Sequence, residues 1–313
     1  WKDGRMVGRI AGIINQLELK HIGENHARFG WLDFTEDEGV SGALMDAVEV
    51  WARTQGMVLL KGPYGFNQLD KTAMLTEGFS TLGTMSTIYN YPYYPQHLER
   101  LGYRKELEWV EVEFELGAQF PERYQRMSDL AQQRYSLHIM QPQNKSEMRK
   151  LGKHLFDLMM ETYRTLPGFT PISKKQQEVY MEKYISFLRM EYVQVITDRE
   201  RTPIGFGVSM PSLSKAMQKA HGKLLPFGIF HLLRARRHND TGDLALIGVK
   251  KGWRKKGIHG IIFNETGKAF IRSGIYRVQT NPMLEFNDSV LSLWKGFSPK
   301  IYKRRRTYKK KLR

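Results

Sequence analysis

The sequence has no cysteine among its 313 residues. This absence excludes disulfide bonds, thiolate metal sites and a cysteine nucleophile, and it is typical of proteins of the reducing cytoplasm. The nine histidines contain no His-x-x-x-His or His-Glu pair, so we expect no bound metal. No apolar run approaches the roughly 20 residues that a membrane-spanning helix requires. We therefore expect a cytoplasmic protein, whose native N-terminus lies upstream of Trp1.

Acidic residues are few relative to basic ones, 32 against 49, which gives a formal net charge of +17. Such an excess predicts an acidic partner: a nucleic acid, an anionic lipid surface or a phosphate-rich cofactor. Part of the excess lies in residues 300–313, which include nine basic residues and no acidic one. We expect this segment either to bind that partner or to be a solvated tail, and residues from 302 onward could also form a last strand.

Hydrophobic periodicity divides the chain into two halves with the same order of elements. The first half is expected to contain strands at 5–14, 29–34, 57–60 and 107–114 and helices at 39–55 and 96–101. The second is expected to contain strands at 135–140, 192–196, 204–208, 244–249 and 275–280 and helices at 146–164, 174–188, 257–271 and 289–294. We predict a first domain at 1–118, a linker helix within 119–134 and a second domain at 135–313.

The stretch 244–271 has the pattern of an anion-binding unit. It begins as an apolar strand, continues as the basic loop 250–256, and opens a helix at Gly257. Backbone N–H groups at a helix N-terminus lack partners, and the helix dipole adds partial positive charge there. A pyrophosphate is the natural ligand for this combination.

The segment Arg254-Lys255-Lys256-Gly257-Ile258-His259 resembles the Arg/Gln-x-x-Gly-x-Gly/Ala signature of the GCN5-related N-acetyltransferase (GNAT) superfamily, with Gly260 one place after the last signature position. The element order of the second half and the pairs Gly102-Tyr103 and Gly296-Phe297 after short helices are also similar to that superfamily. The resemblance implies an α/β (α+β) fold of two tandem GNAT-like domains, each a mixed, mostly antiparallel sheet flanked by helices. It implies acyl-CoA as co-substrate, bound by Ile247, Gly248, Val249, Arg254, Lys255, Lys256, Gly257, Ile258, His259 and Gly260. The competing interpretation is a basic surface loop on an ordinary strand–helix unit.

A closer resemblance covers most of the chain. The segments 62–67, 77–79, 89–94, 222–228 and 303–308 look like the YghO-like family of tandem GNAT proteins, which includes bacterial ceramide synthases. This resemblance implies transfer of an acyl group to an amine, such as that of a sphingoid base. In the first half, which starts at the third strand of a GNAT domain, the corresponding loop 35–40 is acidic and would repel pyrophosphate. We therefore expect a non-catalytic first domain.

N-acyl transfer needs a proton acceptor for the amine and donors for the developing oxyanion. Many GNAT enzymes are similar in having a tyrosine on the last helix, but residues 292–294 are Ser-Leu-Trp here. We predict Glu285, as base, and Asn287 as catalytic residues; the alternative is that Glu285 is a carboxylate at a helix entry. His259 could act as base or contact phosphate, or could have only a structural role at the helix start.

The connection 62–94 of the first half could bind the acceptor. Its aromatic and proline-containing cluster at 89–94 could line a pocket for an apolar chain, and its acids could bind an ammonium group. The predicted substrate-binding residues are Asp70, Glu77, Asn90, Tyr93 and Tyr94, together with Phe227 of the second half. The alternative is that 89–94 is a packed connection under the sheet.

Residues 224–233 are unusually apolar and are followed by Arg234, Arg236 and Arg237. This order resembles an interfacial membrane segment, and the alternative is a hairpin or helix packed on its own domain. The leading hypothesis is an acyl-CoA-dependent N-acyltransferase, with an anionic membrane surface as a further partner. The alternatives are an aminoacyl-tRNA-dependent transferase and a non-catalytic protein that binds membranes or nucleic acid. Nucleic acid is the less favoured partner because no recognised nucleic-acid motif is present.

Overall fold

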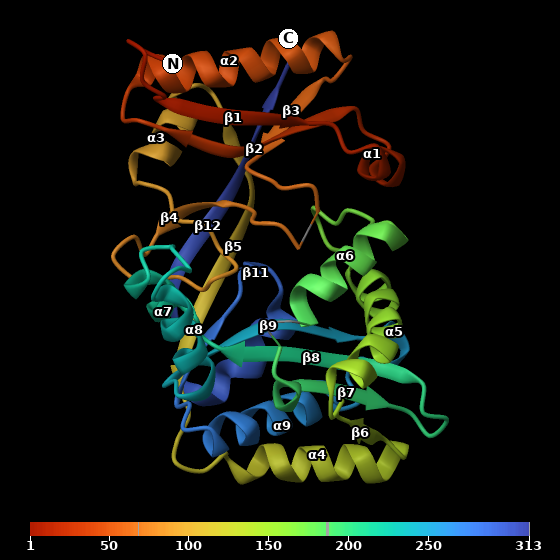
Figure 1. Cartoon of the computed structure of the whole chain (residues 1–313). Helices are drawn as coiled ribbons and strands as arrows, with labels where there is room; N and C mark the ends of the chain where they lie inside the picture. The colour runs from red at the N-terminus through yellow and green to blue at the C-terminus, as the bar shows by residue number, and fades with distance from the viewer. Residues whose placement is uncertain (68, 186–187, 313) are drawn as a thin grey trace.

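The computed structural model of the chain describes residues 1–67, 69–185 and 188–312. Its main feature is a twelve-stranded sheet in which ten strands follow the order β1-β2-β3-β12-β5-β10-β9-β8-β7-β6. The remaining two strands pair at its centre, β4 with β12 and β11 with β5. Figure 1 shows an upper part built around β1–β3 and a lower part built around β6–β9, joined by the long strands β5 and β12.

The strands are β1 Gly8–Ile13, β2 His26–Phe34, β3 Leu59–Gly62, β4 Met74–Glu77, β5 Arg104–Glu115, β6 His138–Met140, β7 Val193–Thr197, β8 Pro203–Pro211, β9 Thr241–Val249, β10 Arg277–Thr280, β11 Met283–Leu284 and β12 Lys300–Lys311. The α-helices are α1 Gln16–Ile22, α2 Glu38–Thr54, α3 Tyr93–Arg100, α4 Glu122–Tyr135, α5 Lys145–Tyr163, α6 Lys174–Ile185, α7 Ser214–Lys219, α8 Gly228–Arg237, α9 Ile258–Arg272 and α10 Asp288–Leu291. Short 3₁₀ helices lie at Met190–Tyr192, Lys251–Trp253 and Ser292–Phe297.

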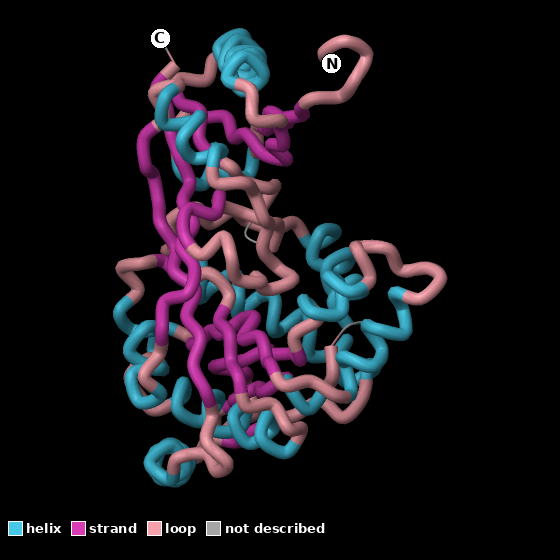
Figure 2. Tube along the Cα trace, turned by 90° about the vertical axis from the view of Figure 1, so that its left-hand side faces the viewer, coloured by secondary structure: helices cyan, strands magenta, loops and turns pink. Residues whose placement is uncertain are grey.

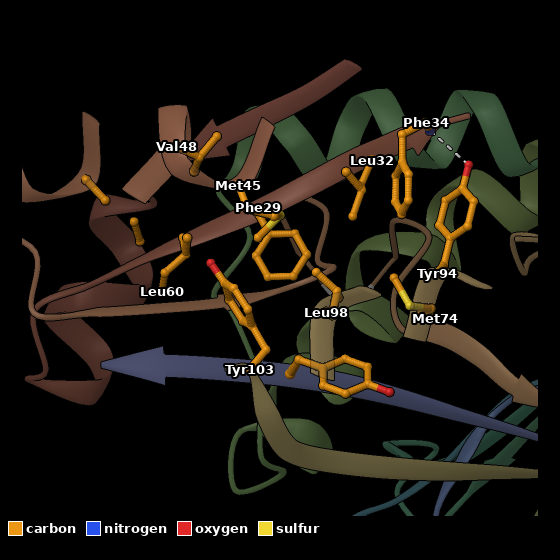
Figure 3. Close-up of a cluster of buried hydrophobic side chains, with 13 residues drawn as sticks. Phe29, Leu32, Phe34, Met45, Val48, Leu60, Met74, Tyr94, Leu98 and Tyr103 are labelled. Atoms are coloured by element: carbon orange, nitrogen blue, oxygen red, sulfur yellow. Dashed lines mark hydrogen bonds between the residues drawn. The ribbon is translucent and has the colours of Figure 1, made fainter. Parts of the chain in front are cut away.

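The core of the first half lies between its sheet and the helices α2 and α3. Figure 3 shows Phe29 and Leu60 of the sheet against Met45 of α2 and Leu98 of α3. Tyr308 of β12 is fully buried in the same cluster, so the last strand of the chain completes the first core. Burying a side chain of this size contributes about 1.5–3 kcal/mol relative to leaving it exposed.

The second half has helices on both faces of its strands. Successive side chains of a strand point to opposite faces. Val195 of β7 accordingly packs with Leu155 of α5, whereas its neighbour Ile196 packs with Ile261 of α9. Helix α4, the predicted linker helix, lies along α9 at the bottom of Figure 1.

Strands β5 and β12 pair antiparallel over nearly their whole length, from Lys300 opposite Glu113 to Lys309 opposite Arg104. The far end of β12 also pairs with β3 of the first half, and the far end of β5 pairs with β10 of the second. Figure 2 shows these strands running between the two parts of the molecule. The two halves therefore share one continuous sheet, although the boundaries predicted at 118 and 134 remain predictions.

The basic segment at the C-terminus is a central strand, which confirms the alternative that residues from 302 onward form a last strand. The expectation of a solvated tail is wrong. The cations of this strand meet acidic side chains within the chain. Arg305 pairs with Glu111 at 2.5 Å, and both side chains are fully buried. Arg306 pairs with Glu108 at 2.8 Å, and Lys310 with Glu49 at 2.8 Å. Much of this charge is therefore neutralised by β5 and by α2.

We predict that Arg305→Met lowers the free energy of unfolding by about 3–5 kcal/mol, because it leaves the Glu111 carboxylate buried without its cation. Glu111→Gln combined with Arg305→Met should lose less, since no charge is then left unpaired. Urea-induced unfolding measures both changes. The control is Lys2→Met, which removes an exposed ion pair to Asp37 and should have little effect. An Arg305→Met variant as stable as the wild type would contradict a structural role for the pair.

Candidate active site

The candidate site begins where β9 and β10 separate. These two strands run parallel, with Arg277 opposite Thr241 and Thr280 opposite Leu244. Beyond this point β10 ends, while β9 continues to Val249 along β8. The second part of β9 therefore has a strand neighbour on one side only.

A β-bulge marks the same point. Val208 of β8 lies opposite Leu246, but the next residue, Ser209, lies opposite Leu244. Ala245 is thus one extra residue in β9. A bulge disrupts the ladder and redirects the backbone groups around it, which is common beside active sites.

Backbone groups of β9 point alternately to its two edges. Lys250 donates its N–H to Ile204 at the end of β8, so the polar groups of Val249 and Ile247 point to the opposite, open edge. The carbonyls on this edge accept hydrogen bonds from side chains: Ile247 from the Tyr163 hydroxyl at 2.9 Å, and Val249 from Arg254 Nε at 3.3 Å. An extended ligand that carries amide groups could pair with such an edge.

The open edge leads to the N-terminus of α9. Gly257 is the N-cap residue with φ 82°, and no side chain caps the helix. A Cβ at this position would lie 2.7 Å from the Cβ of Ala131 in α4, so both the backbone and the packing favour glycine. The first N–H groups of this fifteen-residue helix remain available to an anion.

Three basic side chains, those of Arg254, Lys256 and His259, lie around this helix end. Arg254 holds the carbonyls of Val249 and Thr162, both at 3.3 Å, and so fixes the loop to β9 and α5. The ammonium of Lys256 lies 4.4 Å above the ring of Trp253. His259 is half-buried, and burial together with the charge of Arg254 lowers its pKa, so the imidazole is mainly neutral at pH 7.

Asp243 is a candidate that sequence reasoning missed. It lies in β9, two residues before the bulge at Ala245, and is 3% exposed. Its Oδ1 has no hydrogen-bond partner among the described residues. Burial, with a contribution from the charge of Glu111, raises the pKa of the carboxyl to about 7. The available signal was one acid inside an otherwise apolar strand, Thr-Gly-Asp-Leu-Ala-Leu-Ile-Gly-Val.

A cavity of about 500 Å³ lies between the connection 79–89, α7 and β12. Lys303 and Arg305 line it together with the hydroxyls of Ser80, Thr81, Thr84 and Thr87. Asn281 connects this wall to the bulge: its Oδ1 accepts a hydrogen bond from Thr84 at 3.3 Å, and its Nδ2 donates to Ala245 at 3.1 Å. The first half of the chain thus reaches the point where β9 and β10 separate.

The structure places the two predicted catalytic residues after β11. Glu285 forms an ion pair with Lys105 at 2.7 Å, and its N–H donates to the carbonyl of Glu108. Asn287 donates its N–H to Leu284. Where many GNAT enzymes have a tyrosine, Trp294 packs on Phe114 in the core.

The predicted substrate-binding residues do not form one group. The side chain of Asn90 both accepts from and donates to the backbone of Leu75, and Tyr93 and Tyr94 each hydrogen-bond to the backbone of Phe34. Figure 3 shows Tyr94 beside Phe34. These contacts are those of a packed connection, the alternative interpretation of 89–94. Tyr93 also lines a pocket of about 530 Å³ with Glu36, Tyr91, Pro92 and Gln96, so the substrate-binding role of the cluster stays a prediction.

The other three predicted substrate-binding residues lie apart. Asp70 accepts hydrogen bonds from the N–H of Phe66 and the hydroxyl of Tyr180. Glu77 pairs with Arg304 at 3.3 Å. Phe227 is exposed beside α8. Within the described ranges, no group of three or more His, Asp or Glu side chains is arranged to hold a metal ion.

Comparison with known proteins supports the fold, although no family model matches the chain. Protein YghO of Escherichia coli K12 is 25% identical over 99% of this chain and 80% of its own length. The bacterial ceramide synthase of Caulobacter vibrioides is 23% identical over 99% and 82%. A solved tandem GNAT protein from the clavulanic acid biosynthesis pathway covers 100% of this chain and 81% of its own, with 12% identity and a TM-score of 0.55. The fold predicted from the sequence, two tandem GNAT-like halves, is confirmed.

We predict that Asp243→Asn stabilises the protein at pH 8 but not at pH 4. The pKa of the carboxyl is higher in the folded than in the unfolded state. Between about pH 4 and 7 the folded state therefore holds more protons than the unfolded state, and the stability of the wild type falls as pH rises through this window. The asparagine variant lacks this loss, which amounts to a few kcal/mol at about 1.4 kcal/mol per pKa unit. Urea unfolding of both proteins at pH 4, 6 and 8 gives the difference. A difference that is independent of pH would show that Asp243 is not a buried, titrating carboxyl.

Proposed function

We propose that this protein is an acyl-CoA-dependent N-acyltransferase whose single acyl-CoA site is the open edge of β9 and the N-terminus of α9. The proposal rests on one observation: the open edge of β9 leads directly to the N-terminus of α9. An edge without a strand neighbour, whose N–H groups can donate to a ligand, suits the amides of the pantetheine arm, and an uncapped helix end suits the pyrophosphate. The thioester would then lie near the bulge at Ala245.

Among the described residues of the first half, the corresponding helix end does not offer a second such site. This helix, α2, has Asp37 as N-cap residue, and that carboxylate accepts the N–H groups of Gly39 and Val40. The positions that would hold a phosphate are thus occupied by an anion of the chain itself. This supports a non-catalytic first domain that contributes the acceptor side of the site.

In the proposed reaction the amine nitrogen bonds to the thioester carbonyl carbon and the carbon–sulfur bond breaks. We assign the role of proton acceptor to Asp243, because it is buried beside the bulge with one oxygen unpaired. The proton it takes from the amine is then available to the departing thiolate. Glu285 remains the alternative acceptor, although its side chain is held in an ion pair with Lys105.

The amine is proposed to belong to a lipid-like acceptor such as a sphingoid base. The name of the Caulobacter relative supports this class. The cavity lined by Thr84, Thr87, Lys303 and Arg305 would take the polar end of the acceptor, since it has hydroxyls and lies one residue, Asn281, from the bulge.

Replacing Arg254 and Lys256 together by Glu should abolish the thermal shift that acyl-CoA causes in the wild type, because two cations at the helix end become anions. Since Arg254 also holds two carbonyls, a second variant is needed that changes charge alone. Lys251→Glu with Lys255→Glu, both at exposed positions, should weaken binding without loss of stability.

The matched control is Lys174→Glu with Lys175→Glu, two exposed lysines at the start of α6. Its thermal shift should equal that of the wild type. An aminoacyl-tRNA is titrated in the same assay. An unchanged acyl-CoA shift in both loop variants, or saturation by aminoacyl-tRNA in place of acyl-CoA, would refute the proposed co-substrate.

Asp243→Asn is expected to lower kcat by about 100-fold or more while the acyl-CoA thermal shift is retained, because only proton transfer is lost. In the wild type, kcat/KM should rise with pH and level off above about 7, where the carboxyl is ionised. The variant should lack this rise. Glu285→Gln is assayed beside it, and a large loss of kcat in that variant with Asp243→Asn active would transfer the role to Glu285.

A further inference from the structure

The segment between β8 and β9 has an unusual charge and surface. No Asp or Glu occurs between Glu200 and Asp240, whereas residues 214–238 contain six lysines and arginines. Of these, Lys219, Lys223, Arg234 and Arg237 are exposed. Lys215 is paired with Asp240 at 2.8 Å and is not part of the free charge.

The same segment exposes a dense group of large apolar side chains. Leu225 is 75% exposed, Phe227 72% and Phe230 65%. The complete group is Met217, Leu224, Leu225, Phe227, Ile229, Phe230 and Leu233. The alternative expectation, that the segment packs on its own domain, is therefore wrong for these side chains, although Gly228 and the neighbouring α7 anchor it.

The order along the segment separates the apolar and the charged parts. Phe230 and Arg234 are four residues apart on α8, as are Leu233 and Arg237, so each cation lies one helical turn, about 5.4 Å, beyond an apolar side chain. A short helix of this kind can place its apolar end among acyl chains and its cations at the level of the headgroups. Among the described helices, none is both long and apolar enough to cross a membrane.

We infer that the segment 217–237 is a membrane-docking face that binds the surface of an anionic bilayer. Charge complementarity favours an anionic bilayer as the partner. The segment supplies cations and no anion, and anionic lipid attracts basic residues near its surface. A second copy of this chain would instead bring the same cations against each other.

The position of the face gives it a role in the proposed reaction. Gln218 of α7 lines the cavity at Lys303 and Arg305, and the cavity also includes Leu82 and Tyr89, whose side chains are exposed. Figure 1 shows α7 and α8 together beside β12 and β5. A membrane amine could therefore pass from the bilayer to the cavity. That role rests on the proposed function, whereas docking itself does not.

The test is flotation of the full chain with liposomes in the absence of acyl-CoA. Binding to vesicles of phosphatidylcholine with 30% phosphatidylglycerol, a proportion of roughly one anionic lipid in three, should exceed binding to phosphatidylcholine alone and should fall with salt. Phe227→Ser with Phe230→Ser should lower it by about tenfold or more. Arg234→Glu with Arg237→Glu should do the same by reversing the charge.

Two controls keep the outcomes distinct. Met127→Ser with Leu130→Ser removes exposed apolar side chains from α4, and Lys174→Glu with Lys175→Glu reverses charge on α6; neither should alter flotation. Light scattering gives the oligomeric state of each variant. Equal or absent binding to both vesicles, or a dimer that the serine variant dissociates, would overturn the proposal. Docking with no transferase activity would refute only the proposed function.

Discussion

The structure depends on the pairing of β5 with β12. One strand carries the acids Glu108 and Glu111, and the other carries the cations that match them, with the ion pair between Arg305 and Glu111 completely buried. A buried charge is tolerated only when it is paired and hydrogen-bonded. The register of β12 is therefore fixed by charge as well as by its apolar residues. Because β12 also supplies Tyr308 to the first core, the first half is not complete until the end of the chain is in place.

The polar layer that joins the halves also determines the chemistry of the candidate site. Glu111 is neutralised on one side by Arg305, and on the other it adds negative potential near Asp243. Lys303, in the same layer, donates to the carbonyls of Gly78 and Thr81, both at 2.6 Å, and so fixes the cavity wall. The residues that hold the halves together thus also shape the proposed acceptor cavity, and Glu111 adds to the pKa increase that burial causes at Asp243.

The unit 244–271 and the order of elements were predictable because they are local. A strand, a basic loop and a helix opened by Gly257 each have a signal within a few residues. The role of residues 300–311 was not predictable in this way. Nine cations without an acid indicate a solvated tail until their partners, almost 200 residues earlier, are known. Helix α1 and strand β4 were missed because they are too short to show a sustained hydrophobic periodicity.

The distinction between local and long-range signals also explains which parts of the candidate site could be predicted. The proposed anion-binding end consists of consecutive residues, from Arg254 to Gly260. The proposed acyl-transfer end depends on the bulge at Ala245, which exists only in the register between β8 and β9, and on the burial of Asp243. Glu285 was the favoured base because it follows the strand expected beside the thioester, but charge at that position is already balanced by Lys105.

The net charge of +17 also has a different meaning once the fold is known. The cations of β12 face acids of the chain, so this strand does not require a nucleic acid or a membrane. Exposed cations also lie in two acid-free segments for which binding roles are proposed: the loop 250–256, at the helix end proposed for pyrophosphate, and the segment 217–237, with its exposed apolar side chains. The proposed phosphate-rich co-substrate would account for the first. The second combines charge with Leu225 and Phe227 at the surface, which a nucleic acid would not need and an anionic bilayer would.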